Sequence, residues 1–225
     1  MKLVNYSGNT LSENIFEEFC TWNSIPFTRV ERLVVPTPDY IIDLCHQKVM
    51  VEIKQLDKSD DDKLFMKKIR NAHIASRWES TDKRIRNAID TSRKQFRTYK
   101  NNKVPKLLVI FDNTSLEVIN PDDVRTAMYG DETVSLLVNE TDIQSPPIVK
   151  KVGFGRNKKL SPEVNTTFSA LATLSKFGDG TLFLNIYHNI FAKNPIDPSW
   201  FRSYAVAQFS LSENIPMRLQ DWKVI

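Results

Sequence analysis

Three charged residues early in the chain have the types and spacing to converge at one end of a sheet. Asp39 follows Pro38, and after twelve intervening residues comes the triplet Glu52-Ile53-Lys54. Because side chains of a β-strand alternate between its two faces, Glu52 and Lys54 lie on the same face of a strand. A hairpin with the preceding strand would bring Asp39 to the same end of the sheet. We therefore expect two carboxylates and one amine to converge there.

The chemistry of such a cluster is that of a divalent cation held by oxygen ligands. Two carboxylates about 4 Å apart repel by roughly 4 kcal/mol at an effective dielectric constant of about 20. Such a pair is stable only if it is protonated, compensated by Lys54 or bound to a cation. Hard oxygen ligands favour Mg²⁺, which takes one or two protein carboxylates and also binds substrate phosphate. A centre of this kind polarises a phosphodiester and supplies a bound water, while the lysine stabilises developing charge.

Positive charge is concentrated in one part of the sequence. The 225 residues carry a net charge of +4, but residues 63 to 106 hold fourteen basic residues against three acidic ones. That stretch therefore carries +11 and the remainder −7. A polyanion would be attracted to this region alone. The plainer alternative is a helix with a solvated basic face.

Composition excludes several classes of protein. Hydrophobic residues at 41% and charged residues at 26% are typical of a globular domain. The longest apolar run, from Leu107 to Phe111, is too short for a membrane span, and the N-terminal residues lack a secretory signal. We therefore expect a cytoplasmic protein without a membrane partner. Cys20 and Cys45 fit no disulfide framework or zinc spacing, and the six glycines form no phosphate-binding loop.

Apolar periodicity predicts the order αβββ, helix, β over the first half of the chain. Thr10 and Glu13 have the form of a capping box at the start of the first helix. The expected elements are a helix over 12–23, a strand meander over 27–35, 39–45 and 48–56, a loop over 57–62, a basic and partly helical segment over 63–79, a long helix over 82–100 and a doubly covered strand over 106–112.

The second half gives weaker signals. Three prolines and two glycines predict a long loop over 144–162. The other expected elements are a short helix over 124–129 closed by Gly130 and strands over 133–138, 167–174, 181–187 and 204–211. We expect a core over residues 1–143 and a β-rich extension over 144–225, which is either separate or part of the same domain.

The order of elements around Pro38-Asp39 and Glu52-Ile53-Lys54 resembles the PD-(D/E)XK nuclease superfamily, the fold of restriction endonucleases and Holliday-junction resolvases. The resemblance covers residues 12 to 113, about half of the chain. It implies an α/β fold with a three-layer α/β/α restriction endonuclease-like core, a central mixed sheet and, here, a β-rich C-terminal extension.

The resemblance also implies roles for the charged residues. Asp39 and Glu52 would be the metal ligands, with the carbonyl of Ile53 as a further ligand, and Lys54 would be the catalytic lysine. The metal would be Mg²⁺, with Mn²⁺ as an alternative.

Two other residues match patterns of the same superfamily. Glu13 corresponds to a glutamate that members often carry on the first helix, although the capping box explains Glu13 equally well. The segment Gln95-Phe96-Arg97-Thr98-Tyr99 looks like the QxxxY pattern of RecB-like members. Gln95 is therefore a candidate for the site, whereas Tyr99 fits the apolar stripe of its helix.

Three functions fit these residues. The first is a Mg²⁺-dependent nuclease for DNA, in which Arg86, Arg93, Arg97 and Lys100 of the long helix bind phosphates. The second is a nucleic-acid-binding module with the same fold and no turnover. The third is a protein-interaction domain whose basic face meets an acidic partner. RNA in place of DNA, and a homodimer, stay open at this point.

Overall fold

The computed structural model describes residues 9–31, 36–72, 81–98, 103–114, 119–138, 146–202, 204, 206–211 and 222–225. The helices are α1 (Leu11–Trp22), α2 (Asp60–Ala72), α3 (Asp82–Thr98), α4 (Pro121–Tyr129) and the short 3-10 helix η1 (Pro198–Phe201). The strands are β1 (Phe27–Arg29), β2 (Tyr40–Leu44), β3 (Gln47–Asp57), β4 (Lys106–Asn113), β5 (Glu132–Leu137), β6 (Ile148–Phe154), β7 (Ala170–Lys176), β8 (Leu182–His188), β9 (Val206–Leu211) and β10 (Trp222–Val224).

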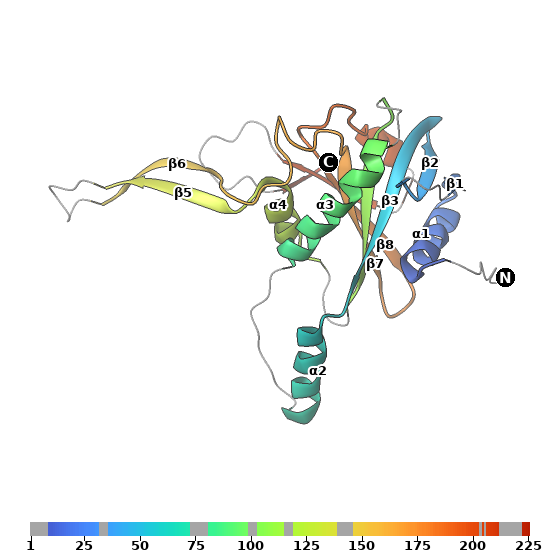
Figure 1. The fold of residues 1–225 in the computed structure, drawn as a ribbon, viewed down its shortest axis with the longest axis horizontal. Helices are drawn as coiled ribbons and strands as arrows, with labels where there is room; N and C mark the ends of the chain where they lie inside the picture. Colours follow the sequence, from blue (N-terminus) through green and yellow to red (C-terminus); the bar gives the residue numbers. More distant parts are fainter. Residues whose placement is uncertain are drawn as a thin grey trace.

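Eight of these strands form one mixed sheet in the order β1-β2-β3-β4-β7-β8-β9-β10 (Figure 1). The first three are the expected antiparallel meander, although β1 ends at Arg29 and residues 32–35 lie outside the described residues. Cys45 and His46 form the β2–β3 turn with φ of 51° and 64°, a left-handed pair that matches the twist of a hairpin. β3 then pairs in parallel with β4, and β4 in parallel with β7.

Helices cover both faces of this sheet. Alternation along β3 places Val51 against Phe16 of α1 on one face. On the other face, Met50 belongs to the cluster formed with Ile85 of α3 and Met128 of α4. Figure 1 shows α1 on one side of β3 and α3 and α4 on the other. The mixed α/β fold expected from the sequence is confirmed.

The C-terminal part of the chain completes the same sheet. β7 pairs directly with β4 in the centre, and β8, β9 and β10 follow beside it. The boundary expected between residues 143 and 144 therefore falls between β5 and β6, which form a separate two-stranded sheet. The long loop expected over 144–162 was wrong in its centre, where β6 occupies residues 148–154.

α2 begins earlier than expected because Ser59 caps it. The Ser59 amide donates to Asp62 Oδ2 at 2.6 Å, and the Asp62 amide donates to Ser59 Oγ at 3.1 Å. This reciprocal pair satisfies two amides at the start of the helix. The loop expected over 57–62 is therefore shorter, since α2 starts at Asp60. Figure 1 shows α2 beyond the end of β3, away from the sheet.

None of the helices in these described ranges has the length and apolar character needed to cross a membrane.

α4 ends at a glycine that its surroundings require. Asn120 caps its first turn, accepting a hydrogen bond from the Asp122 amide at 2.8 Å, and Gly130 follows its last turn with φ of 99°. A Cβ atom at Gly130 would lie 2.6 Å from the carbonyl oxygen of Arg156. Both the backbone angle and the available space therefore favour glycine here.

We expect Gly130→Ala to lower the free energy of unfolding by about 1–3 kcal/mol, because it adds backbone strain and a close contact. Gly178→Ala is the matched control, since no atom lies within 4 Å of a Cβ at that position. Urea unfolding followed by circular dichroism measures both. Equal stability of the two variants would contradict this explanation.

Candidate active site

The β2–β3 hairpin brings Asp39 beside the Glu52-Ile53-Lys54 triplet. Tyr40 pairs with Val51, and the Asp39 amide donates to the Val51 carbonyl at 3.0 Å. One step further along this register, Asp39 lies opposite Glu52. Asp39 Oδ2 also accepts a hydrogen bond from the Ile53 amide at 2.8 Å. The convergence expected from the sequence is therefore present in the structure.

Glu52 and Lys54 lie on the face of β3 that α3 covers. Their side chains form an ion pair, with 2.6 Å between Lys54 Nζ and Glu52 Oε1. The Glu52 side chain is only 2% exposed, whereas that of Lys54 is 25% exposed. The amine is thus held at the border between the core and solvent, directly beside a buried carboxylate.

The Glu52 carboxylate is in an unfavourable place for a negative charge. Burial is the largest effect and the charge of Asp39 adds to it, so the pKa of Glu52 rises from 4.5 to about 7 although Lys54 opposes the shift. Glu52 Oε2 is buried and has no hydrogen-bond partner in the described part of the chain. A further positive charge beside this oxygen would stabilise the ionised form.

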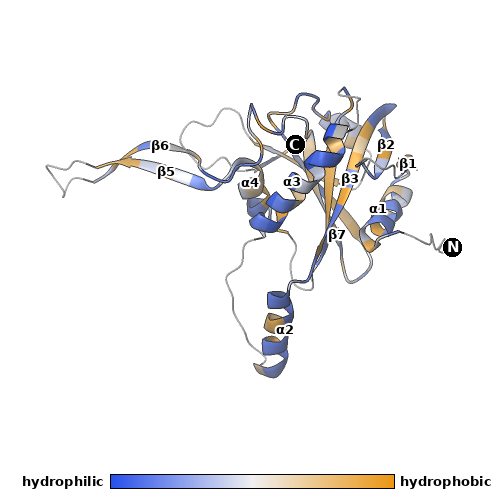
Figure 2. Cartoon of the chain, in the orientation of Figure 1, coloured by the Kyte–Doolittle hydropathy of each residue, from blue (hydrophilic) through white to orange (hydrophobic). Residues whose placement is uncertain are grey.

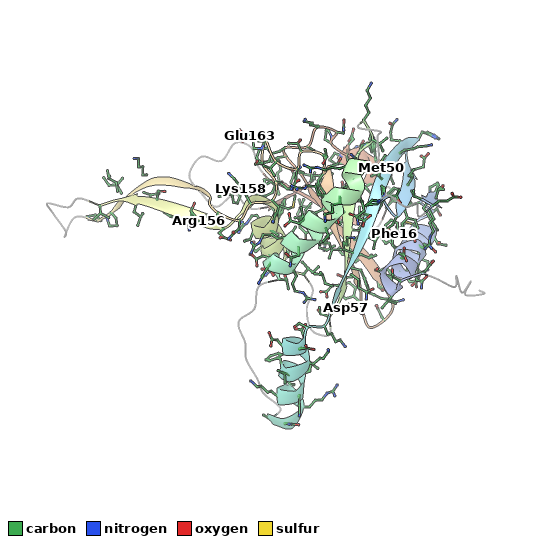
Figure 3. The ribbon with its side chains drawn as sticks, viewed as in Figure 1. Phe16, Met50, Asp57, Arg156, Lys158 and Glu163 are labelled. Carbon is green, nitrogen blue, oxygen red and sulfur yellow. The ribbon has the colours of Figure 1, made fainter. Side chains whose placement is uncertain are left out.

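An open cavity of about 640 Å³ borders these groups. Asp57 at the end of β3 lies on its rim and is labelled in Figure 3. The pKa of Asp57 is lowered, first by its hydrogen bond from Asn113 and then by that from Gln55. The cavity is lined by Thr10, Leu11, Ser12, Glu13, Pro36, Thr37, Asp39, Glu52, Ile53, Lys54, Gln55, Asp57 and Gln95.

Glu13 has both of the properties expected for it. It completes the capping box of α1, because Glu13 Oε2 accepts from the Thr10 amide at 2.6 Å and from Thr10 Oγ1 at 3.0 Å. It is also buried and lines the cavity. The start of α1 is tied to β3 by the Ser12 amide, which donates to Gln55 Oε1 at 3.1 Å. Glu13 is thus part of the wall near the carboxylates.

Gln95 reaches the same cavity from α3, and its Oε1 is buried without a hydrogen-bond partner among the described atoms. Thr91 and Arg84 lie on the same flank of α3, four and eleven residues earlier, as the helical repeat of about 3.6 residues requires. They line a second hollow of about 340 Å³, which shares Lys54 with the cavity. The two hollows form a groove along this flank of α3. Arg84 was not among the residues predicted for the site. Its position on the same flank of α3 as Gln95 is the sequence signal that could have identified it.

Arg93 and Arg97, expected to bind nucleic acid, lie on the opposite flank of α3. They follow Arg86 by seven and eleven residues, so all three share one side of the helix. The buried stripe that includes Ile85 and Phe96 separates this side from the flank of Gln95. The structure therefore does not bring the predicted arginines together with the carboxylates.

Two other basic residues of this stretch have structural roles. Arg86 forms an ion pair with Asp82 and lies 3.9 Å from Asp131, with its side chain 15% exposed. Lys106 is buried, and its Nζ donates to the carbonyl oxygen of Phe96 at 3.1 Å near the end of α3. Lys100 and Tyr99 lie outside the described residues. The basic surface is therefore smaller than the sequence count of charges indicates.

The donors at the cavity suit a hard divalent cation. Within the described ranges, no group of three or more His, Cys, Asp and Glu residues could hold a metal ion. Mg²⁺ nevertheless takes only one or two protein carboxylates and keeps several waters. Asp39 and Glu52 supply two, and the unpaired Glu52 Oε2 offers a free coordinating oxygen. The amide of Ile53 points to Asp39, at the β2 edge of β3. The carbonyl of a strand residue points to the same edge as its amide, so the Ile53 carbonyl is also directed there.

Comparison of the chain with models of protein families, with curated proteins and with solved structures gave no match. The interpretation of the site therefore depends on its residues and their geometry.

The raised pKa of Glu52 gives the stability of the protein a definite pH dependence. Between pH 4.5 and about 7, the folded state keeps a proton on Glu52 that the unfolded state has released. The stabilisation that the Glu52 proton contributes to the folded state is fully present below pH 4.5 and is lost as the pH rises through about 7. We expect the wild type to lose up to about 3 kcal/mol of its free energy of unfolding over this pH range, and Glu52→Gln not to show this loss.

Urea unfolding of both proteins in a chelating buffer at several pH values between 4 and 8 measures this difference. Asp43→Asn, on the same strand as Tyr40 but at its other end, serves as the control and should follow the wild type. Parallel curves for the wild type and Glu52→Gln would show that the Glu52 proton does not contribute.

Proposed function

We propose that the chain is a Mg²⁺-dependent nuclease with a PD-(D/E)XK centre, a restriction endonuclease-like arrangement of layers and DNA as its substrate. The observation that carries the proposal is the buried oxygen of Glu52, which lies beside Asp39 without a partner while Lys54 binds the other oxygen at 2.6 Å. When both acids are ionised this pair is unfavourable, and a cation between them would stabilise it.

Each residue has a chemical task in hydrolysis. Asp39 and Glu52 would hold a Mg²⁺ ion, which would supply a water of lowered pKa and polarise the phosphodiester. The hydrogen bond from the Ile53 amide to Asp39 fixes that carboxylate in position. The oxygen of the attacking water would form the new bond to phosphorus while the bond to the leaving oxygen breaks. The attacking water would lose its proton to solvent, and a solvent water would protonate the leaving oxygen. The Lys54 ammonium stabilises the negative charge that develops on the phosphate.

The groove along α3 provides a path for a chain of phosphates. Arg84 lies in its wall next to Lys54 and Asp57. Exposed Lys63, Lys67 and Arg70 on α2 follow beyond the end of β3. Lys63 pairs with Asp60, and Arg84 lies 3.8 Å from Asp62. Lys67 and Arg70 would therefore be the main cations at this end that offset the repulsion between a polyanion and the two acids. Cleavage of RNA in place of DNA is an outcome of the assay.

A catalytically silent nucleic-acid-binding module is the second candidate. It is favoured by the absence of a third acidic or histidine ligand among the described residues. The Glu52–Lys54 ion pair and the Asp39–Ile53 hydrogen bond would then serve only to hold the end of the hairpin. Binding without cleavage by any preparation would support this candidate.

We expect Asp39→Ala, Glu52→Ala and Lys54→Ala each to reduce Mg²⁺-dependent cleavage by at least about 100-fold, because each removes a charge used in the transition state. The assay compares plasmid, duplex, single-stranded DNA and RNA substrates with Mg²⁺, Mn²⁺ or chelator. Asp43→Ala is the control, since Asp43 belongs to β2 but lies at the other end of that strand, opposite Lys48. Unchanged cutting by Glu52→Ala would reject the assignment.

Arg93 and Arg97 should affect affinity and not the chemical step, because they lie across α3 from the groove. If both bind phosphates of a duplex, replacing both with Ala should reduce the slope of log K against log salt by about 2. Cleavage by the double variant at saturating enzyme should stay close to that of the wild type. An unchanged salt slope would exclude these arginines from the interface.

A further inference from the structure

The β5–β6 hairpin is an arm that projects from the rest of the protein (Figure 1). Its outer half is coloured as hydrophobic in Figure 2. Six of its apolar side chains, between 47% and 66% exposed, are Val134, Leu136, Leu137, Val138, Ile148 and Val149. An isolated two-stranded hairpin is marginally stable in water, and exposed apolar patches mark interaction sites. The arm therefore has the surface of an element that packs against a partner.

The base of the arm is closed by backbone hydrogen bonds between its two strands and lies beside α4. The Gly155 amide donates to the Asp131 carbonyl at 2.6 Å, and the Asp131 amide donates to the Arg156 carbonyl at 3.1 Å. Arg125 of α4 lies 3.9 Å from Glu132 at the start of β5. Figure 3 shows Arg156 at this base. The arm is thus held at one end and extends its outer half into solvent.

A β-bulge in β6 places Val149 on the face of the arm that carries Val134 and Leu136, whereas Leu137 and Ile148 lie on the other face. Ser135 pairs with Lys151, but the next residue, Leu136, pairs with Val149, which leaves Lys150 as the extra residue. Val149 therefore shares a face with Leu136 and Val134. Without the bulge, Lys150 would occupy this face.

The two edges of the arm differ in their protection against pairing. β6 carries the bulge and two adjacent lysines, which are features that prevent edge-to-edge association. Residues 133–138 of the β5 side, from Thr133 to Val138, contain no charge and no proline. Within the described residues, β5 pairs only with β6, so the outer edge of β5 is open.

We infer that two copies of this chain associate through β5, which pairs antiparallel with β5 of the second copy across a two-fold axis to form a four-stranded sheet. A two-fold contact must be self-complementary, and the uncharged residues 133–138 meet their own copy without repulsion. A nucleic acid would need basic residues at the contact, which β5 lacks. The apolar faces of both arms then form one continuous surface. This inference does not depend on nuclease activity.

Sedimentation velocity of the full chain tests the inference. At about 20 μM the wild type should be a dimer, and Ser135→Glu and Leu136→Glu should each raise the dimer dissociation constant at least tenfold. Ser135→Glu preserves the hairpin, because a glutamate there lies opposite Lys151. Leu64→Glu on α2, at 58% exposure against 51% for Leu136, is the control and should stay dimeric. A monomeric wild type, or a dimer unaffected by both β5 variants, would overturn the inference.

Cross-linking keeps the test valid if a charged variant fails to fold. In a Cys45→Ser background, single cysteines placed along residues 133–138 should form intermolecular disulfides at the positions nearest the two-fold axis. Lys150→Cys on β6 is the control and should not cross-link. Cross-linking through Lys150→Cys but none through β5 would contradict the inference. Weaker DNA binding by Leu136→Glu with a monomeric wild type would identify the arm as a nucleic-acid contact instead.

Discussion

The balance of charge among Asp39, Glu52 and Lys54 is the interaction on which the site depends. Two carboxylates about 4 Å apart repel by roughly 4 kcal/mol at an effective dielectric constant of about 20, and burial adds to that cost. Lys54 contacts one oxygen of Glu52 at 2.6 Å, but the pKa of Glu52 still rises to about 7. One amine therefore compensates the two acids only in part. The remaining imbalance is what a divalent cation would neutralise.

The architecture of the sheet holds these charges in place. The two-residue turn at Cys45 and His46 fixes the β2–β3 register, which sets Asp39 opposite Glu52. β2 and β4 flank the edges of β3 and helices cover its faces, so Glu52 is removed from solvent. α1 and α3 then enclose the end of β3 from opposite faces of the sheet. The cavity thus lies where β3 continues to Asp57, beyond Val51, which is its last residue paired with β2.

Much of this arrangement could be predicted from the sequence because it is set locally. Period-two alternation places Glu52 and Lys54 on one face, and the apolar stripe of α3 defines its buried side. The position of the arginines relative to the site could not be predicted in this way. Charge alone does not say which flank of α3 faces β3. It also does not reveal that Arg86 lies near Asp131 or that Lys106 binds the carbonyl oxygen of Phe96. The strand expected over 133–138 is confirmed as β5, but β6 was missed because its glycine and its bulge interrupt the alternation.

The central claim is that Asp39 and Glu52 share one divalent cation. Anomalous diffraction from crystals of the protein soaked in Mn²⁺ tests it most directly, because the signal locates the metal independently of activity. The account predicts a single peak about 2 Å from an oxygen of each carboxylate, as expected for hard oxygen ligands. Well-ordered Asp39 and Glu52 side chains without a peak between them, at saturating Mn²⁺ and at a pH above the pKa of Glu52, would contradict it.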